Sequence, residues 1–118
     1  MQNTTTPILE NICANCVAVT NGEETYLFSY ESPILKIKND EIIEIYPNYD
    51  YSITTTKHIN KFIDQYGYLK ILGKNIYTLD NPKRKKLIKE FYNAKTNEYK
   101  IALSKALSTI YNKDVLNE

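Results

Sequence analysis

Hydrophobic and polar residues alternate along much of the first half of the chain, as they do in half-buried β-strands. The pattern predicts a first strand over residues 12–20 and a return strand over 25–30. Between them lies Asn21-Gly22, a dipeptide that favours a tight hairpin turn. Period-two alternation places three aromatic residues of the return strand on one face: Tyr26, Phe28 and Tyr30.

A second hairpin is predicted around Asn39-Asp40, between the apolar runs 34–38 and 42–46. Ser32-Pro33 is expected to interrupt the strand before it, since proline cannot donate a backbone hydrogen bond. Lysines alternate with apolar residues in the first of these runs, so one face should be wet. We therefore expect an antiparallel sheet that is covered on one side only.

The pattern becomes helical over residues 54–66, where apolar side chains recur at intervals of three and four. Three hydroxyl residues are competent amino-terminal caps: Ser52, Thr54 and Thr55. Gly67 is placed to end the helix. Short strand-like pieces follow over residues 68–72 and 76–79.

A long helix is predicted over residues 81–112, capped by Asp80 or Asn81, with Pro82 in its first turn. Unbroken from 81 to 111, it would span roughly 45 Å at about 1.5 Å per residue. Such a helix either breaks at Thr96-Asn97 or projects and pairs with a second chain as a homodimer.

Together these elements predict one α+β domain over residues 1–118. An antiparallel sheet of hairpins packs against one short helix and one long C-terminal helix. The expected parts are a polar tail over 1–7, a sheet region over 12–79 that includes the helix 54–66, and the helix 81–112.

Composition narrows the functional classes. The net charge is +1, so the chain as a whole is no polycation, and nucleic-acid binding would need a local basic patch. No apolar run reaches the roughly 18 residues of a membrane span. The polar start, without an apolar signal region, predicts a cytoplasmic protein and no membrane contact.

Catalytic and metal-binding signals are weak. Cys13 and Cys16 form half of a zinc site, and the simplest interpretation is two reduced, partly buried thiols; a metal bridge between two chains stays open. His58 is the only histidine, and no residue that would orient it for catalysis is evident. We expect no enzyme and no cofactor.

A cluster of polar and aromatic residues surrounds the start of the first helix. It offers hydroxyl groups, cations and tyrosine rings beyond what one helix cap needs. Helix capping is the competing explanation. The residues predicted to contact a partner are Tyr49, Tyr51, Ser52, Thr54, Thr55, Lys57, His58 and Lys61.

A basic run occupies the first turns of the C-terminal helix, where the helix dipole disfavours cations. It would suit a nucleic-acid backbone or an acidic protein surface, and the alternative is a solvated helix face opposite Leu87 and Ile88. The run consists of Lys83, Arg84, Lys85, Lys86 and Lys89.

Two segments resemble an uncharacterised family of small phage and mobile-element proteins. The first is Ser29-Tyr30-Glu31-Ser32-Pro33-Ile34. The second runs from Tyr51 to Phe62 and follows the pattern Tyr-Ser-x-Thr-Thr-x-Lys-His-x-x-x-Phe. The resemblance covers about residues 28–63 and implies no catalytic residues.

The resemblance implies a non-enzymatic interaction protein in the cytoplasm of a bacterial host. By analogy of size and character, we expect an anti-CRISPR or other anti-defence inhibitor that binds and blocks a host effector, such as a CRISPR nuclease complex. The alternative is a small nucleic-acid-binding or regulatory protein that uses the basic run on phosphates.

Overall fold

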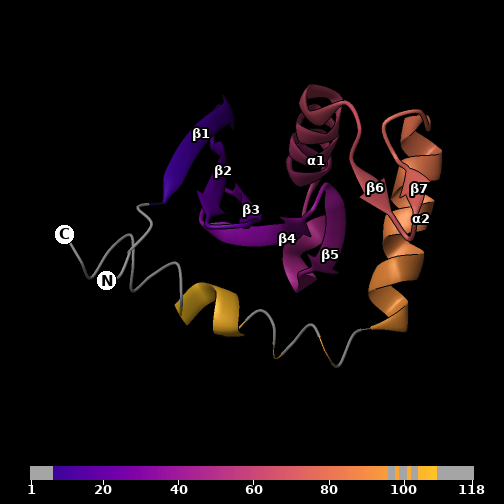
Figure 1. The fold of residues 1–118 in the computed structure, drawn as a ribbon. Coiled ribbons are helices and arrows are strands. Elements are labelled where there is room, and N and C mark those ends of the chain that lie inside the picture. Colours follow the sequence, from indigo (N-terminus) through magenta and orange to yellow (C-terminus); the bar gives the residue numbers. More distant parts are fainter. Residues whose placement is uncertain (1–6, 96–97, 99–100, 102–103, 109–118) are drawn as a thin grey trace.

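A computed structural model describes residues 7–95, 98, 101 and 104–108 of the chain. Its centre is a seven-stranded sheet in which the strands lie side by side in chain order (Figure 1). The strands are β1 (Ile8–Cys13), β2 (Cys16–Asn21), β3 (Glu24–Ser29), β4 (Ser32–Lys38), β5 (Glu41–Ile45), β6 (Lys70–Ile71) and β7 (Lys74–Asn75).

Tight turns join the first five strands, and both predicted hairpins are confirmed. Gly22 adopts a φ of 69° between β2 and β3, while Asn39 and Asp40 adopt φ values of 54° and 63° between β4 and β5. The predicted single strand over residues 12–20 is wrong. Asn15, with a φ of 62°, turns the chain so that Cys13 pairs with Cys16 across a further hairpin. Asparagine tolerates this left-handed conformation better than most residues do.

Two features of the sheet depart from the expected antiparallel ladder. Pro33 lies within β4 rather than ending it, because it sits opposite Phe28 where the register between β3 and β4 shifts. Such a bulge tolerates a residue that has no N–H group. The pairing of β5 with β6 is parallel, through Glu41 and Lys70, so the sheet is mixed.

The helices are the 3₁₀ helix η1 (Pro47–Asp50) and the α-helices α1 (Ile53–Tyr66) and α2 (Asn81–Ala94). The caps predicted for the two α-helices are confirmed. The Ser52 hydroxyl accepts a hydrogen bond from the Thr55 N–H, Gly67 ends α1 with a φ of 80°, and the Asp80 carboxylate accepts from the Lys83 N–H.

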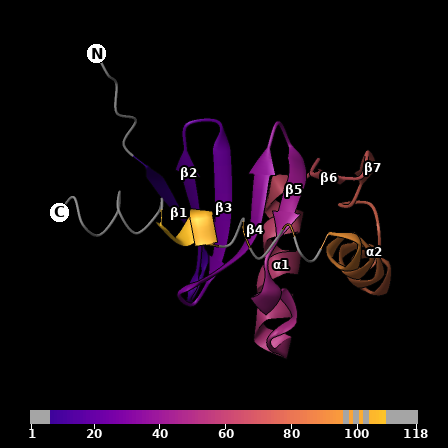
Figure 2. The same ribbon diagram turned by 90° about the horizontal axis from the view of Figure 1, so that it is seen from below.

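The unbroken form of the predicted helix over 81–112 is wrong, because α2 ends at Ala94. Residues 98, 101 and 104–108 are helical again, and the alternative break at Thr96-Asn97 lies outside the described residues. In Figures 1 and 2 the later helical segment lies below the sheet, away from α2. The expectation of a homodimer rested on one long projecting helix, and α2 does not form such a helix. The homodimer stays a prediction.

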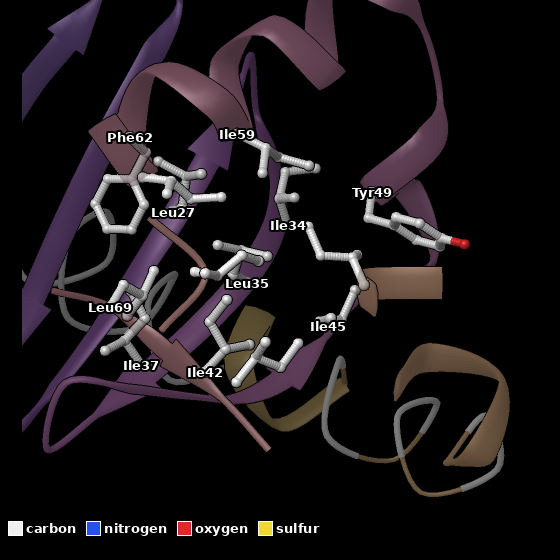
Figure 3. Close-up of a cluster of buried hydrophobic side chains, with 14 of the residues drawn as sticks. Leu27, Ile34, Leu35, Ile37, Ile42, Ile45, Tyr49, Ile59, Phe62 and Leu69 are labelled. Atoms are coloured by element: carbon white, nitrogen blue, oxygen red, sulfur yellow. The ribbon is translucent and has the colours of Figure 1, made fainter. Parts of the chain in front are cut away.

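Helix α1 covers one face of the sheet, and its apolar side chains form the main core with those of the strands (Figure 3). Ile59 and Phe62 of α1 lie over Leu27 and Ile34, where Figure 3 shows the side chains meeting. Helix α2 lies against β5 and adds a further row to the same core: Leu87, Ile88 and Phe91.

The opposite face of the sheet carries a smaller apolar cluster that includes Val19, Tyr26 and Tyr46. Ala106, from the later helical segment, is buried against it. The expectation that the sheet is covered on one side only is therefore wrong. Lys36 lies on this face with its Nζ 3.2 Å from a Glu24 carboxylate oxygen and 5.5 Å from the centre of the Tyr26 ring.

Of the three aromatic residues expected on one face, Tyr26 and Phe28 do belong to this second cluster. Tyr30 leaves the strand and enters the turn that follows it. Within the part of the chain that the structure describes, no helix has the length and apolar character needed to cross a bilayer.

Arg84 joins α2 to α1 and to the chain before α2. Its side chain is buried, with the residue only 5% exposed. Nε donates to the Ile76 carbonyl at 3.1 Å, Nη1 donates to the Asn60 side-chain oxygen at 3.1 Å, and Nη2 lies 2.8 Å from an Asp64 carboxylate oxygen. Nη2 also donates to the Tyr77 carbonyl at 2.8 Å. One guanidinium thus satisfies four acceptors from two segments, helix α1 and the chain before α2.

Replacing Arg84 with methionine should lower the free energy of unfolding by about 2–4 kcal/mol, because two backbone carbonyls and a carboxylate lose their donor. The matched control is Lys86→Met, which removes an exposed cation from the same helix and should change stability by less than about 0.5 kcal/mol. Urea unfolding followed by circular dichroism measures both. Equal losses in the two variants would contradict the structural role of Arg84.

Candidate functional site

An open pocket of about 570 Å³ lies where the turn after β3 meets the start of α1. The turn contributes one wall, while η1 and the first residues of α1 contribute the other. The lining residues are Ser29, Tyr30, Glu31, Ser32, Ile34, Asn48, Tyr51 and Thr55. The pocket thus draws on two segments that lie about twenty residues apart in the chain.

One buried and one exposed hydrogen bond hold the two walls together. His58, which is 5% exposed, has its Nδ1 atom 2.7 Å from the Ser29 hydroxyl. This contact joins α1 directly to the end of β3. Near the rim, the Asn48 amide donates to the Ser32 hydroxyl at 3.1 Å and so joins η1 to β4. Both contacts fix the two walls of the pocket relative to each other.

Tyr30 occupies an unusual backbone conformation for a bulky residue, with a φ of 57°. The left-handed region disfavours residues with a Cβ by roughly 1–2 kcal/mol, and glycine or asparagine normally fills it. The turn holds Tyr30 there through its N–H, which donates to the Asn15 carbonyl at 2.7 Å. Its ring lies 5.7 Å from the His58 ring, centre to centre. Backbone strain of this kind is common where a side chain has a functional task.

The rim of the pocket is aromatic and largely open to solvent. Tyr30 is 54% exposed and Tyr51 is 77% exposed. Glu31 is also exposed, and it is the charged residue among those that line the pocket. The site therefore offers two tyrosine side chains, one carboxylate and several neutral oxygen atoms.

The hydroxyl residues of the predicted cluster mainly serve the helix start. Ser52 caps α1, and the Thr55 hydroxyl lies 3.2 Å from that of Ser52. The Thr56 hydroxyl donates to the Ser52 carbonyl at 3.4 Å. Thr54 is exposed, whereas Thr55 is buried at the pocket wall. The hydroxyl groups of Ser52, Thr55 and Thr56 thus all form contacts within the first turn of α1.

The other members of the predicted cluster separate in space. Tyr51 borders the pocket, but Tyr49 is buried with its ring 4.9 Å from that of Tyr92, and this burial raises the pKa of its phenol. His58 lies beneath the surface, in contact with the pocket wall. Lys57 and Lys61 are exposed along α1 and are not among the residues that line the pocket.

The structure also divides the basic run. Lys83, Lys85, Lys86 and Lys89 are exposed on α2, whereas Arg84 points inward and bonds within the protein. Lys85 lines a narrow crevice of about 30 Å³ between α1 and α2, together with Tyr49 and Arg84. The solvent-facing part of the run thus consists of lysines, and it does not line the larger pocket.

The predicted cluster missed six of the eight residues that line the pocket: Ser29, Tyr30, Glu31, Ser32, Ile34 and Asn48. A signal for five of these existed, because the segment 29–34 is one of the two that carry the family resemblance. The sequence could show both segments, but their meeting across the pocket needed the tertiary structure.

Cys13 and Cys16 are free thiols, the first half-buried and the second buried. They pair across the β1–β2 hairpin, and Cys16 also pairs with Ser29 of β3. Burial, followed by the proximity of Cys13, raises the pKa of the Cys16 thiol to about 12. Among the described residues, no group of three or more His, Cys, Asp or Glu side chains is arranged to hold a metal ion.

Comparison with known proteins gives one match, to the model of a family of unknown function, DUF8033, over residues 2–78. This covers more than half of the chain. The chain belongs to the DUF8033 family. The matched region contains every residue that lines the pocket, and it ends before α2 with its lysines and Arg84. No curated protein and no solved structure matches the chain.

Because its thiol is buried and its pKa is raised, Cys16 should resist alkylation in the native protein. At pH 8 the shift from 9.0 to about 12 lowers its thiolate fraction by about 1,000-fold. Iodoacetamide labelling followed by peptide mass spectrometry measures the rate, with urea-unfolded protein as the control. Equal labelling rates in native and unfolded protein would contradict the buried, protonated thiol.

If the Tyr30 side chain serves binding rather than folding, Tyr30→Asn should change the free energy of unfolding by no more than about 1 kcal/mol. Relief of backbone strain offsets the lost contact with the His58 ring. Tyr26→Asn is the matched control, because Tyr26 is buried, and it should cost about 3 kcal/mol or more. A comparable loss in both variants would show that the Tyr30 ring is structural.

Proposed function

We propose that this protein is a non-enzymatic interaction protein that binds a partner protein through the rim of its pocket. The observation that carries the proposal is the exposure of Tyr30 and Tyr51 around one preformed concavity. Tyrosines are enriched among the residues that dominate binding energy, since they bury a large area with little loss of rotamer entropy. Neighbouring exposed apolar side chains mark interaction sites more often than scattered ones do.

The Ser29–His58 pair supports binding better than catalysis. A serine nucleophile must be accessible, yet Ser29 is only 3% exposed and its hydroxyl is engaged with His58. Among the described residues, no hydrogen bond joins His58 to a carboxylate that would orient it as a base. In this proposal the pair is a structural link between β3 and α1.

The proposed setting is the cytoplasm of a bacterial host, and the proposed partner is a host effector. The finer assignment is an anti-CRISPR or other anti-defence inhibitor that blocks its target by covering a working surface. What supports it is the resemblance of residues 28–63 to small phage and mobile-element proteins, together with the exposed tyrosine rim. The pocket itself has no feature that distinguishes one host target from another.

A second candidate, nucleic-acid binding, is favoured by the exposed lysines of α2. Lys83, Lys85, Lys86 and Lys89 all face solvent within two turns of helix. Each phosphate contact on duplex DNA would contribute a slope of about −0.9 to the dependence of log affinity on log salt concentration. A protein partner held by tyrosine side chains should depend much less on salt.

A tagged pull-down from a bacterial lysate with a CRISPR effector, with and without nuclease, tests the proposal. Capture of a stoichiometric protein should survive nuclease treatment, and Tyr51→Ala should weaken its measured affinity by about tenfold or more. Tyr77→Ala, at another exposed tyrosine away from the pocket, is the matched control and should bind normally.

A second variant in the same experiment tests the exposed lysines of α2. Replacing Lys83, Lys85, Lys86 and Lys89 together by alanine should leave protein capture intact. If capture disappears with nuclease, or with the lysine variant but not with Tyr51→Ala, the protein is a nucleic-acid binder and the pocket proposal is wrong.

A further inference from the structure

The chemistry of the pocket indicates which group of a partner enters it. We propose that the pocket receives a basic side chain, arginine above all, from the surface of the partner protein. This inference rests on the proposed function, and it adds the chemical class of the guest.

The first argument is charge. Glu31 lines the pocket, whereas no lysine or arginine does so. Among the described residues Glu31 forms no ion pair, so its carboxylate is available to an incoming cation. A phosphate or carboxylate guest would meet repulsion here, and this disfavours a nucleic-acid backbone as the occupant.

The second argument is the aromatic rim. Tyr30 and Tyr51 both border the pocket and are more than half exposed, so their rings are accessible. A guanidinium or ammonium group within about 6 Å of a tyrosine ring is attracted by the negative face of the ring. Arginine gains most from such a site, because its planar group stacks on rings while its edge N–H groups still donate hydrogen bonds.

The third argument is the supply of acceptors. The side-chain amide nitrogen of Asn48 donates to the Ser32 hydroxyl, which leaves the side-chain oxygen Oδ1 of Asn48 as an acceptor beside the pocket. Guanidinium has five N–H donors and no acceptor, so it is matched to a lining that offers carboxylate and neutral oxygen atoms. The floor is already satisfied internally, since the Ser29 hydroxyl pairs with His58.

The strain at Tyr30 fits the same interpretation. A φ of 57° at a bulky residue keeps the aromatic ring at the pocket edge, where asparagine or glycine would relieve the backbone but leave no ring. Together, the carboxylate, the rings and the free acceptors surround a volume of about 570 Å³, which lies within the ordinary range of binding pockets.

The test is an NMR titration of the ¹⁵N-labelled full chain with the blocked peptide acetyl-Gly-Arg-Gly-amide. Saturable shift changes are expected at the amides of Tyr30, Glu31 and Tyr51, with a dissociation constant on the order of 10 mM for so small a probe. The matched peptide carries citrulline in place of arginine, which keeps the shape but removes the charge. It should bind at least about fivefold more weakly.

A protein variant provides the second control. Glu31→Gln should weaken binding of the arginine peptide by about three- to fivefold, because a neutral amide replaces the carboxylate. Glu23→Gln, at an exposed site in the β2–β3 turn, should leave binding unchanged. Both substitutions lie at exposed turn positions, so each variant should fold.

Three results would overturn the inference: no saturable shifts at the pocket, equal binding of the arginine and citrulline peptides, or no effect of Glu31→Gln. Adenosine is included as an uncharged stacking probe. If adenosine saturates the pocket and the arginine peptide does not, a nucleobase is the better guest. If Glu31→Gln captures the partner normally while Tyr51→Ala does not, the proposed function stands and the basic guest is wrong.

Discussion

Burial of the apolar side of α1 against β3 and β4 is the interaction on which the rest of the structure depends. Each large side chain removed from water there, such as Ile59 or Phe62, contributes about 1.5–3 kcal/mol before entropic costs. This packing of α1 on the sheet fixes the position of the helix along the strands, and therefore the position of its cap, Ser52. Because Tyr51 immediately precedes this cap, the packing also brings Tyr51 opposite the turn after β3 and so creates the pocket.

Buried polar contacts define the positions of α1 and α2 more closely than apolar packing alone does. The hydrogen bond between His58 and Ser29 joins α1 to β3 within the buried layer, and Arg84 joins α2 to α1 in a similar manner. Buried polar groups of this kind tolerate few alternative arrangements, because an unpaired group costs more than a paired one gains. The pocket therefore stands on a scaffold with a defined geometry, and the strained turn at Tyr30 forms part of its lining.

The basic run shows which features of a side chain can be predicted from the spacing of residues along one helix. A cluster of cations at the start of a helix suggested one contact surface, yet Arg84 lies on the same helical face as Leu87, Ile88 and Phe91. The spacing of three, four and seven residues was visible in the sequence and would have assigned Arg84 to the interior. Its acceptors could not be identified in this way, since Ile76, Asn60 and Asp64 come from a loop and from another helix.

The sequence by itself determined the features that depend on neighbours within a few residues. These are the two hairpin turns, the extent of α1, and the caps at Ser52, Gly67 and Asp80. Tertiary structure decided the features that depend on distant partners: the bulge that admits Pro33 and the parallel pairing of β5 with β6. The pocket belongs to the second group, because Tyr30 and Tyr51 meet only through the docking of α1 on the sheet. Propensity and periodicity report local free energies, whereas such a meeting is set by how the whole core packs.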